Sequence, residues 1–173
     1  AFICPTKYVQ GEDELLCLGY FIKSFGNSAF VVASDEDVDR VGDQLRQTAE
    51  KFGITFERSG FKGKCTMEEV QRLQKMAENK GCDCTVGLGG GQAIEASKCV
   101  AQGEKLIVVP TIAATDSPTS HSAVLYTDDG HFDEYAYFTS SPSVVLVDTK
   151  VIASSPVRFL IAGMGDALST YFE

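Results

Sequence analysis

Apolar and polar positions along this chain follow two alternating patterns, one typical of helices and one typical of buried strands. Apolar residues recur every three or four positions over residues 15–25, 38–52 and 70–77, which predicts three amphipathic helices. Gly53 follows the second stripe as a helix-ending residue, and Gly81 ends the third. Thr66 and Glu69 precede the third stripe with the spacing of a capping box, in which each side chain caps the other residue's backbone N–H.

Five short, nearly continuous apolar runs separate these stripes, and each is bounded by glycine, proline, aspartate or serine. Strands of a parallel sheet have this composition, because helices bury them on both faces. Alternation of such strands with helices is typical of a doubly wound α/β domain, so we expect a mostly parallel, Rossmann-like sheet. The predicted strands cover residues 29–33, 54–56, 85–88, 106–109 and 144–147.

Residues 123–138 break this alternation and predict a β-hairpin inserted into the domain. Two strand-like runs, 123–126 and 131–138, flank the turn sequence Thr-Asp-Asp-Gly. Within it, Asp129-Gly130 favours a hairpin turn in which both central residues take positive φ.

The segment 157–173 has helical spacing, with Leu160, Met164 and Leu168 on one face and Pro156 before its first turn. Gly163 and Gly165 lie within it, and each costs about 1 kcal/mol relative to alanine, so we expect a reason other than helix propensity for them. We also expect the apolar face to be exposed and to promote self-association.

The composition of the chain excludes some classes of binding partner. The 173 residues carry 15 Lys+Arg against 24 Asp+Glu, a net charge of −9, which argues against nucleic acid and against anionic membrane surfaces. No run approaches the ~20 apolar residues of a membrane-spanning helix, and the first residues lack the pattern of a signal peptide. We therefore expect no nucleic-acid or membrane partner, and a cytoplasmic location.

The six cysteines and two histidines offer little catalytic chemistry. We expect Cys4, Cys17, Cys65, Cys82, Cys84 and Cys99 to be free thiols, most of them buried, because a domain this size needs no disulfide framework. Cys82 and Cys84 have no second pair with which to bind zinc. His121 and His131 flank the hairpin, where we expect them to be solvated.

The strongest local signal is the glycine-rich stretch 87–92, which follows a predicted strand and precedes a predicted helix. Glycines in such a turn let backbone N–H groups approach a phosphate, and the helix N-terminus adds positive potential. The strict dinucleotide fingerprint fails, because Gln92 or Ile94 stands where the last glycine belongs. A tight turn without a ligand is the alternative, but we predict phosphate or pyrophosphate binding.

Two further segments carry candidate chemistry. Residues 110–120 follow the strand 106–109 and combine hydroxyl groups with Asp116, which suits ribose, pyrophosphate or a polyol, or else a locally bonded turn. Asp166 lies in an apolar helical segment, where a carboxylate is costly to bury unless it is paired or binds metal. A helix-start cap after a break at Gly165 is the alternative for Asp166.

Together, these segments resemble the N-terminal domain of the iron-containing (group III) alcohol dehydrogenase superfamily, and within it the glycerol dehydrogenases. The segments 87–91, 110–116, 126–130, 147–150 and 163–168 carry the resemblance, in the family's order and spacing. It implies bound NAD, a divalent metal that is zinc by preference or iron, and oxidation of glycerol to dihydroxyacetone. It also implies a small polyol as substrate and a homo-oligomer in the full-length form.

The resemblance also implies roles for individual residues. Asp116 matches the carboxylate beside the glycerol, and Asp166 matches the first metal ligand and also lies at the substrate. Asp35 stands one position after the family's ribose-binding aspartate and is the candidate for that role. The implied cofactor contacts are Gly89, Gly90, Gly91, Gln92, Ala93, Glu95, Thr111, Ile112, Ala114, Thr115, Ser120, Ser122 and Tyr126.

The chain also departs from the family. Residues 92–95 read Gln-Ala-Ile-Glu where the family has Lys-Thr-Leu-Asp, and the chain's histidines do not match the family's two remaining metal ligands. We therefore expect a cofactor-binding fragment that is inactive alone, with an NAD-binding domain at 1–155 and a truncated metal-ligand helix at 156–173. A natural half-protein, a stand-alone nucleotide-binding module, and a relative of glycerol-1-phosphate dehydrogenase or dehydroquinate synthase are the alternatives.

Overall fold

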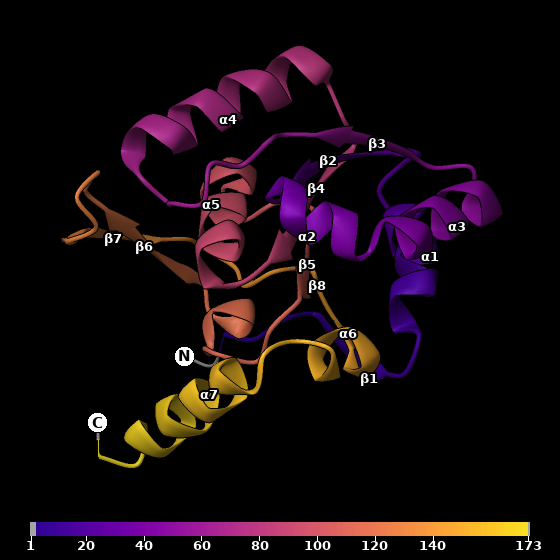
Figure 1. Cartoon of the computed structure of the whole chain (residues 1–173). Coiled ribbons are helices and arrows are strands. Elements are labelled where there is room, and N and C mark those ends of the chain that lie inside the picture. The colour runs from indigo at the N-terminus through magenta and orange to yellow at the C-terminus, as the bar shows by residue number, and fades with distance from the viewer. Residues whose placement is uncertain (1–2, 173) are drawn as a thin grey trace.

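A computed structural model describes residues 3–172, which form a six-stranded parallel sheet between two layers of helices, with a separate antiparallel hairpin (Figure 1). The strand order is β1-β8-β5-β4-β2-β3, and every neighbouring pair is parallel. The predicted fold class is therefore confirmed. The strands of the sheet are β1 Lys7–Gly11, β2 Ser28–Val32, β3 Thr55–Arg58, β4 Cys84–Gly89, β5 Leu106–Pro110 and β8 Val144–Asp148.

The five apolar runs mark five of these strands, with ends that differ by one or two residues. The sequence pattern missed β1, because this edge strand is largely exposed and reads Lys-Tyr-Val-Gln-Gly. Among the described strands, β1 pairs with β8 alone and forms an edge of the sheet, so it needs no continuous apolar run.

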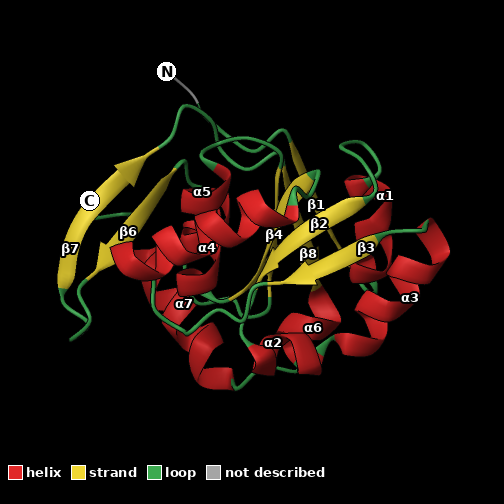
Figure 2. Ribbon diagram, turned by 90° about the horizontal axis from the view of Figure 1, so that it is seen from above, coloured by secondary structure: helices red, strands yellow, loops and turns green. Residues whose placement is uncertain are grey.

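Successive residues of the central strands point into two separate apolar layers. In β2, Ala29 and Val31 pack with the helices at one face of the sheet, and Phe30 and Val32 pack at the other. α1, α2, α3 and α6 cover the first face, and α4, α5 and the hairpin cover the second (Figure 2). These helices are α1 Leu18–Ile22, α2 Asp35–Arg40, α3 Gly42–Phe52, α4 Met67–Lys80, α5 Gly91–Ala101 and α6 Thr149–Ala153, with short 3-10 turns at Glu14–Cys17 and Ser117–Thr119.

Helix ends follow the sequence in part. Gly53 and Gly81 both take left-handed conformations, with φ of 61° and 60°, and end α3 and α4 as predicted. One of the two hydrogen bonds of the predicted capping box forms: the Thr66 hydroxyl accepts a 3.2 Å hydrogen bond from the Glu69 N–H. The Glu69 carboxylate turns instead to Arg72 and to the Lys62 N–H. The predicted helix 38–52 is divided at Val41 into α2 and α3.

The hairpin is present, but its turn differs from the prediction. β6 Ser122–Tyr126 pairs antiparallel with β7 Phe132–Tyr137, and a register shift falls at Leu125/Tyr126. Gly130 has a φ of 88°, whereas Asp129 keeps a negative φ, so a turn with positive φ at both positions was the wrong prediction. The longer 127–131 connection explains this, because Gly130 alone occupies a left-handed position after a turn closed by the Gly130 N–H and the Thr127 carbonyl.

The last helix, α7 Val157–Ser169, is continuous through both of its glycines, so the alternative of a helix start after Gly165 is wrong. Gly163 is explained by a close approach, because a Cβ there would lie 2.2 Å from the Ala113 carbonyl oxygen. Nothing in the structure explains Gly165. Across residues 3–172, no helix combines the length and apolar character needed to cross a membrane.

Candidate functional site

The order of the strands creates a switch point where the chain reverses direction across the sheet. After β2 the chain moves outward to β3, and it then returns to β4 on the other side of β2 (Figure 1). Ligands of open α/β sheets bind outside the carboxyl ends of the strands at such a point. Two segments flank this point, the start of α2 and the glycine-rich turn between β4 and α5, and the loop after β5 lies beside them.

The glycine-rich turn presents the N-terminus of α5 at this edge. Gly90 is the N-cap of α5, and within the described part of the chain no side chain caps the helix. The N–H groups of its first turn are therefore available to a ligand, and the helix dipole adds positive potential there. Phosphate binding at this turn stays a prediction, because uncapped N–H groups at a helix start are a common but not a specific phosphate site.

Close neighbours explain why this turn needs glycines. A Cβ on Gly89 would lie 3.0 Å from Asp37 Oδ2, and the φ of Gly89 is 146°. A Cβ on Gly90 would lie 2.9 Å from the Ile112 side chain. On Gly91 it would lie 3.2 Å from Thr115 Cγ2. The predicted residues Ile112 and Thr115 thus pack directly on the turn.

The residues after the turn divide between surface and core. The Gln92 side-chain oxygen accepts a 2.8 Å hydrogen bond from the Cys65 N–H, and the same amide bonds the Tyr126 hydroxyl. Gln92 thereby joins the hairpin and the loop before α4 to the start of α5. Ala93 is buried, and its methyl group packs beneath Gly89.

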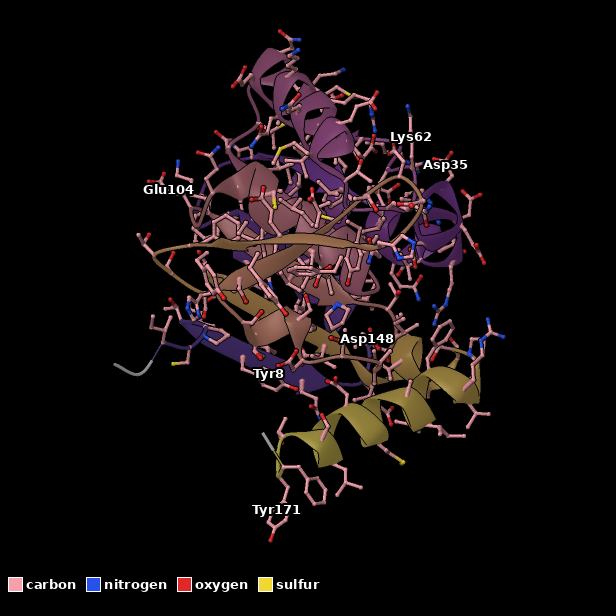
Figure 3. All side chains as sticks on the ribbon, turned by 90° about the vertical axis from the view of Figure 1, so that its left-hand side faces the viewer. Tyr8, Asp35, Lys62, Glu104, Asp148 and Tyr171 are labelled. Carbon is pink, nitrogen blue, oxygen red and sulfur yellow. The ribbon has the colours of Figure 1, made fainter. Side chains whose placement is uncertain are left out.

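Two carboxylates at the start of α2 have different surroundings. Asp35 is exposed in the first turn of the helix, at the periphery of the molecule (Figure 3). Asp37 points back to the switch point, where its carboxylate accepts hydrogen bonds from Thr111 Oγ1 at 2.9 Å and Ser34 Oγ at 2.8 Å. Asp37 was not among the residues predicted from the sequence. The sequence feature that could have revealed Asp37 is Ser34, three residues earlier. Ser34 is the N-cap of α2, and its hydroxyl accepts a hydrogen bond from the Asp37 N–H, so Asp37 lies near the end of β2.

Thr111 is buried at the centre of this arrangement. Its N–H donates to the Gly89 carbonyl at 3.0 Å, and its own carbonyl accepts a hydrogen bond from Arg40 at 3.1 Å. The Arg40 guanidinium also bonds the Val151 carbonyl and Ser154 Oγ. The cation of α2 is therefore already engaged by neighbouring oxygens.

Asp116 and Asp166 come together although they are far apart in the sequence. The Asp116 N–H donates a 3.1 Å hydrogen bond to Asp166 Oδ2. The glycine contact of α7 with Ala113 and Ala114 holds the two segments close. A catalytic zinc usually has three protein ligands, yet among residues 3–172 no group of three or more histidine, cysteine or acidic side chains is placed to hold a metal. The described residues alone therefore do not fit a metal centre.

A cavity of about 510 Å³ opens beside Asp116, between the β5 loop, the ends of β1 and β8, and α6 and α7. Most of its lining is apolar, and Gln10, Thr119 and Thr149 add polar groups. Among the residues that the structure describes, neither lysine nor arginine lines it.

Ser120, Ser122 and Glu95 meet around a buried lysine that the sequence analysis did not single out. Lys98 Nζ donates 2.8 Å hydrogen bonds to Ser120 Oγ and to the Ser122 carbonyl. Glu95 is 9% exposed and accepts a hydrogen bond from the Val124 N–H. Burial raises the pKa of Glu95 to about 7, although Lys98 opposes this shift. The signal for Lys98 was a Glu–Lys pair one turn apart in an otherwise apolar helix.

The six cysteines are free thiols, with Cys65, Cys84 and Cys99 buried, Cys17 and Cys82 half-buried and Cys4 exposed. Of the histidines, His131 is exposed and His121 is half-buried beside the Tyr137 ring.

Residues 5–149 match the family model described as iron-containing alcohol dehydrogenase. The chain is 40% identical to glycerol dehydrogenase of Citrobacter freundii and 43% identical to that of Pseudomonas putida, each over 98% of this chain and 47% of the relative. A crystal structure of a probable glycerol dehydrogenase from Sinorhizobium meliloti 1021 is 36% identical and superposes with a TM-score of 0.91, over 100% of this chain and 48% of that one. The chain thus spans about half the length of the curated relatives it matches.

Proposed function

This chain belongs to the iron-containing alcohol dehydrogenase family, and from that membership we propose that it is the NAD-binding part of a dehydrogenase that oxidises glycerol or a similarly small polyol. The observation that carries the proposal is the convergence of three segments at one sheet edge. The uncapped start of α5, the Asp37–Thr111 pair and the Asp116–Asp166 pair all lie there.

The nucleotide would bind with its pyrophosphate on the first N–H groups of α5 and its adenosine ribose toward α2. Acidic residues recognise ribose hydroxyls at this position in dinucleotide-binding folds. Asp37 is the carboxylate that abuts the glycine-rich turn, and we propose that it takes this role; Asp35 stays a prediction as a second candidate. The first turn of α2 also carries Glu36, so this end repels a 2′-phosphate and favours NAD over NADP.

The substrate would lie beside Asp116. A carboxylate there accepts hydrogen bonds from the hydroxyls of a polyol and orients the carbinol carbon toward the nicotinamide. A phosphate ester would meet two carboxylates and a cavity without a cation, which favours a neutral polyol over glycerol 1-phosphate.

The reaction moves two electrons as a hydride from the carbinol C–H to NAD⁺, and the alcohol O–H proton goes to solvent or a base. Asp166 offers one carboxylate, so we assign no step to a metal ion. Homo-oligomer formation, the cytoplasmic location and the domain boundary near residue 155 stay predictions.

Calorimetric titration of the 173-residue chain with NAD⁺ tests the proposal. We expect saturable binding to one site per chain, and no NADH formation from glycerol with added Zn²⁺. A chain that does not bind NAD⁺ would contradict the proposal.

The second candidate is a nucleotide-binding module that acts without catalysis. It is favoured because residues 3–172 include no group of three or more histidine, cysteine or acidic side chains placed to hold a metal. A protein that joins this chain to the second half of the Citrobacter freundii enzyme separates the two. NADH formation from glycerol by that protein, abolished by Asp116→Asn, supports the dehydrogenase. NAD⁺ binding without turnover supports the module.

A further inference from the structure

Lys98, on α5, is a deeply buried charged residue, with 2% of its surface exposed. A buried ammonium group is costly unless hydrogen bonds and an opposite charge replace its water shell. Lys98 Nζ donates to the Ser117 carbonyl, and also to Ser120 Oγ and the Ser122 carbonyl at 2.8 Å each. Three protons thus meet three oxygens of one segment, and Ser117 Oγ lies at 3.4 Å.

The segment that Lys98 binds connects the parts of the proposed site. Residues 117–122 run from Asp116, beside the cavity, to β6, which ends at Tyr126 above Gln92. Lys98 itself belongs to α5, whose first turn is the glycine-rich turn. Its bonds therefore join the proposed pyrophosphate site to the loop of the proposed substrate site.

Glu95 completes the arrangement one turn earlier on α5. Its carboxylate supplies the opposite charge and accepts a hydrogen bond from the Val124 N–H of β6. The two side chains thus anchor both the 117–122 segment and the hairpin to the same helix.

We propose that Lys98 is a positioning residue, whose ammonium group fixes residues 117–122 against α5 so that Asp116 and Tyr126 are held in place for the nucleotide and substrate. This inference rests on the proposed NAD binding and adds a residue to it. Lys98 touches neither ligand, because it is buried beneath the segment.

Protonation of Lys98 governs this contact. Glu95 and Cys99 of α5, Cys65 of the loop before α4, and Asp116 are the titratable groups that act on it. Burial lowers the pKa of Lys98 to about 8. The neutral amine that forms above this pH keeps two N–H donors for three acceptors, so the segment is held less firmly.

Hydrogen exchange and NAD⁺ calorimetry on Lys98→Met test the proposal, because methionine keeps much of the volume without the charge. The double variant Glu95→Gln/Lys98→Met leaves no unpaired buried charge and covers the case in which the single variant fails to fold. Lys75→Met, at an exposed lysine of α4, is the control. We expect faster exchange confined to residues 117–126 and NAD⁺ affinity weaker on the order of tenfold in both Lys98 variants, with the control unchanged.

The pH dependence of NAD⁺ affinity distinguishes a positioning role of Lys98 from a role in the stability of the fold alone. An unfolded lysine keeps its proton up to its ordinary pKa of 10.5, so this buried lysine makes the wild-type fold more stable as pH rises from about 8. If Lys98 positions the segment, the NAD⁺ affinity of the wild type shows the opposite trend and falls as pH rises from about 8. In the Lys98 variants, this pH-dependent fall in affinity is absent.

The inference would be overturned if the double variant kept wild-type hydrogen-exchange protection at residues 117–126 and wild-type NAD⁺ affinity. It would also be overturned if the NAD⁺ affinity of the wild type rose with pH together with the stability of the fold. If the wild type binds no NAD⁺, the proposed function fails, and the exchange data still decide whether Lys98 fixes the segment.

Discussion

Asp35 and Asp37 stand two residues apart on α2 and face different surroundings. Asp37 contacts Thr111 and the glycine-rich turn, whereas Asp35 faces solvent. We predict that Asp37→Asn weakens NADH binding about tenfold, because a charged acceptor is lost, and relieves repulsion of the 2′-phosphate of NADPH. Fluorescence titration with both nucleotides measures the preference, and Asp35→Asn is the matched control. An unchanged preference in Asp37→Asn together with a changed one in Asp35→Asn would assign the role to Asp35.

The buried Glu95 carboxylate makes a pH-dependent contribution to stability. Its pKa is raised from 4.5 to about 7 by burial, so between these values the folded chain holds more protons than the unfolded chain. This group's contribution is therefore lost as pH rises through that window, with a slope of at most about 1.4 kcal/mol per pH unit. Urea unfolding of the wild type and Glu95→Gln at several pH values measures it. Parallel stability curves for the two proteins would contradict this prediction.

At the residue scale, the sequence predicted the site residues that directly follow a predicted strand. It missed the residues whose side chains contact a distant element of the fold. The glycine-rich turn and Asp116 follow predicted strands, so their edge of the sheet was foreseeable. The resemblance placed both Asp116 and Asp166 at the substrate, and the hydrogen bond between them is seen only in the structure. Asp37 and Lys98 were missed because each reaches its partners on another element, and no local spacing reveals that reach.

At the scale of elements, two glycines of α7 have opposite expected effects. A Cβ at Gly163 meets the Ala113 carbonyl oxygen at 2.2 Å, and one at Gly165 meets nothing within 4 Å. We predict that Gly163→Ala destabilises the docking of α7 by about 1–3 kcal/mol and that Gly165→Ala stabilises the helix by up to about 1 kcal/mol. Hydrogen exchange of the α7 amides measures both. Equal effects of the two substitutions would show that the glycine contact is not what holds α7.

Element prediction succeeded where burial is strong and local. Four of the five predicted strands, β2, β4, β5 and β8, lie in the interior of the sheet, and their apolar runs are nearly unbroken. The exposed edge strand β1, the division of the second helix at Val41 and the turn before Gly130 depend instead on pairing and loop length. Local composition carries little information on those features.

At the scale of the whole molecule, α7 is only thinly covered by the rest of the described chain. No residue of α7 is buried, and Leu160, Met164 and Leu168 are all exposed, as expected from the sequence. In Figure 3 the helix runs along one end of the molecule, and Tyr171 projects away from it.

We predict that this apolar face makes the chain self-associate. Light scattering behind size-exclusion chromatography should show a mass that rises with concentration, and Met164→Glu/Leu168→Glu should lower it. Asp39→Lys, at an exposed position on α2, is a control for a charge change elsewhere. A wild-type chain that stays monomeric at high concentration would contradict this prediction.

The central claim is that this domain binds NAD⁺ at the edge formed by the glycine-rich turn, α2 and the β5 loop. An NMR titration of the labelled chain with NAD⁺ tests it most directly, because every amide reports its own surroundings. We expect saturable shifts concentrated at residues 34–37, 89–93 and 111–122. Shifts centred elsewhere on the molecule, or none at saturating NAD⁺, would contradict it.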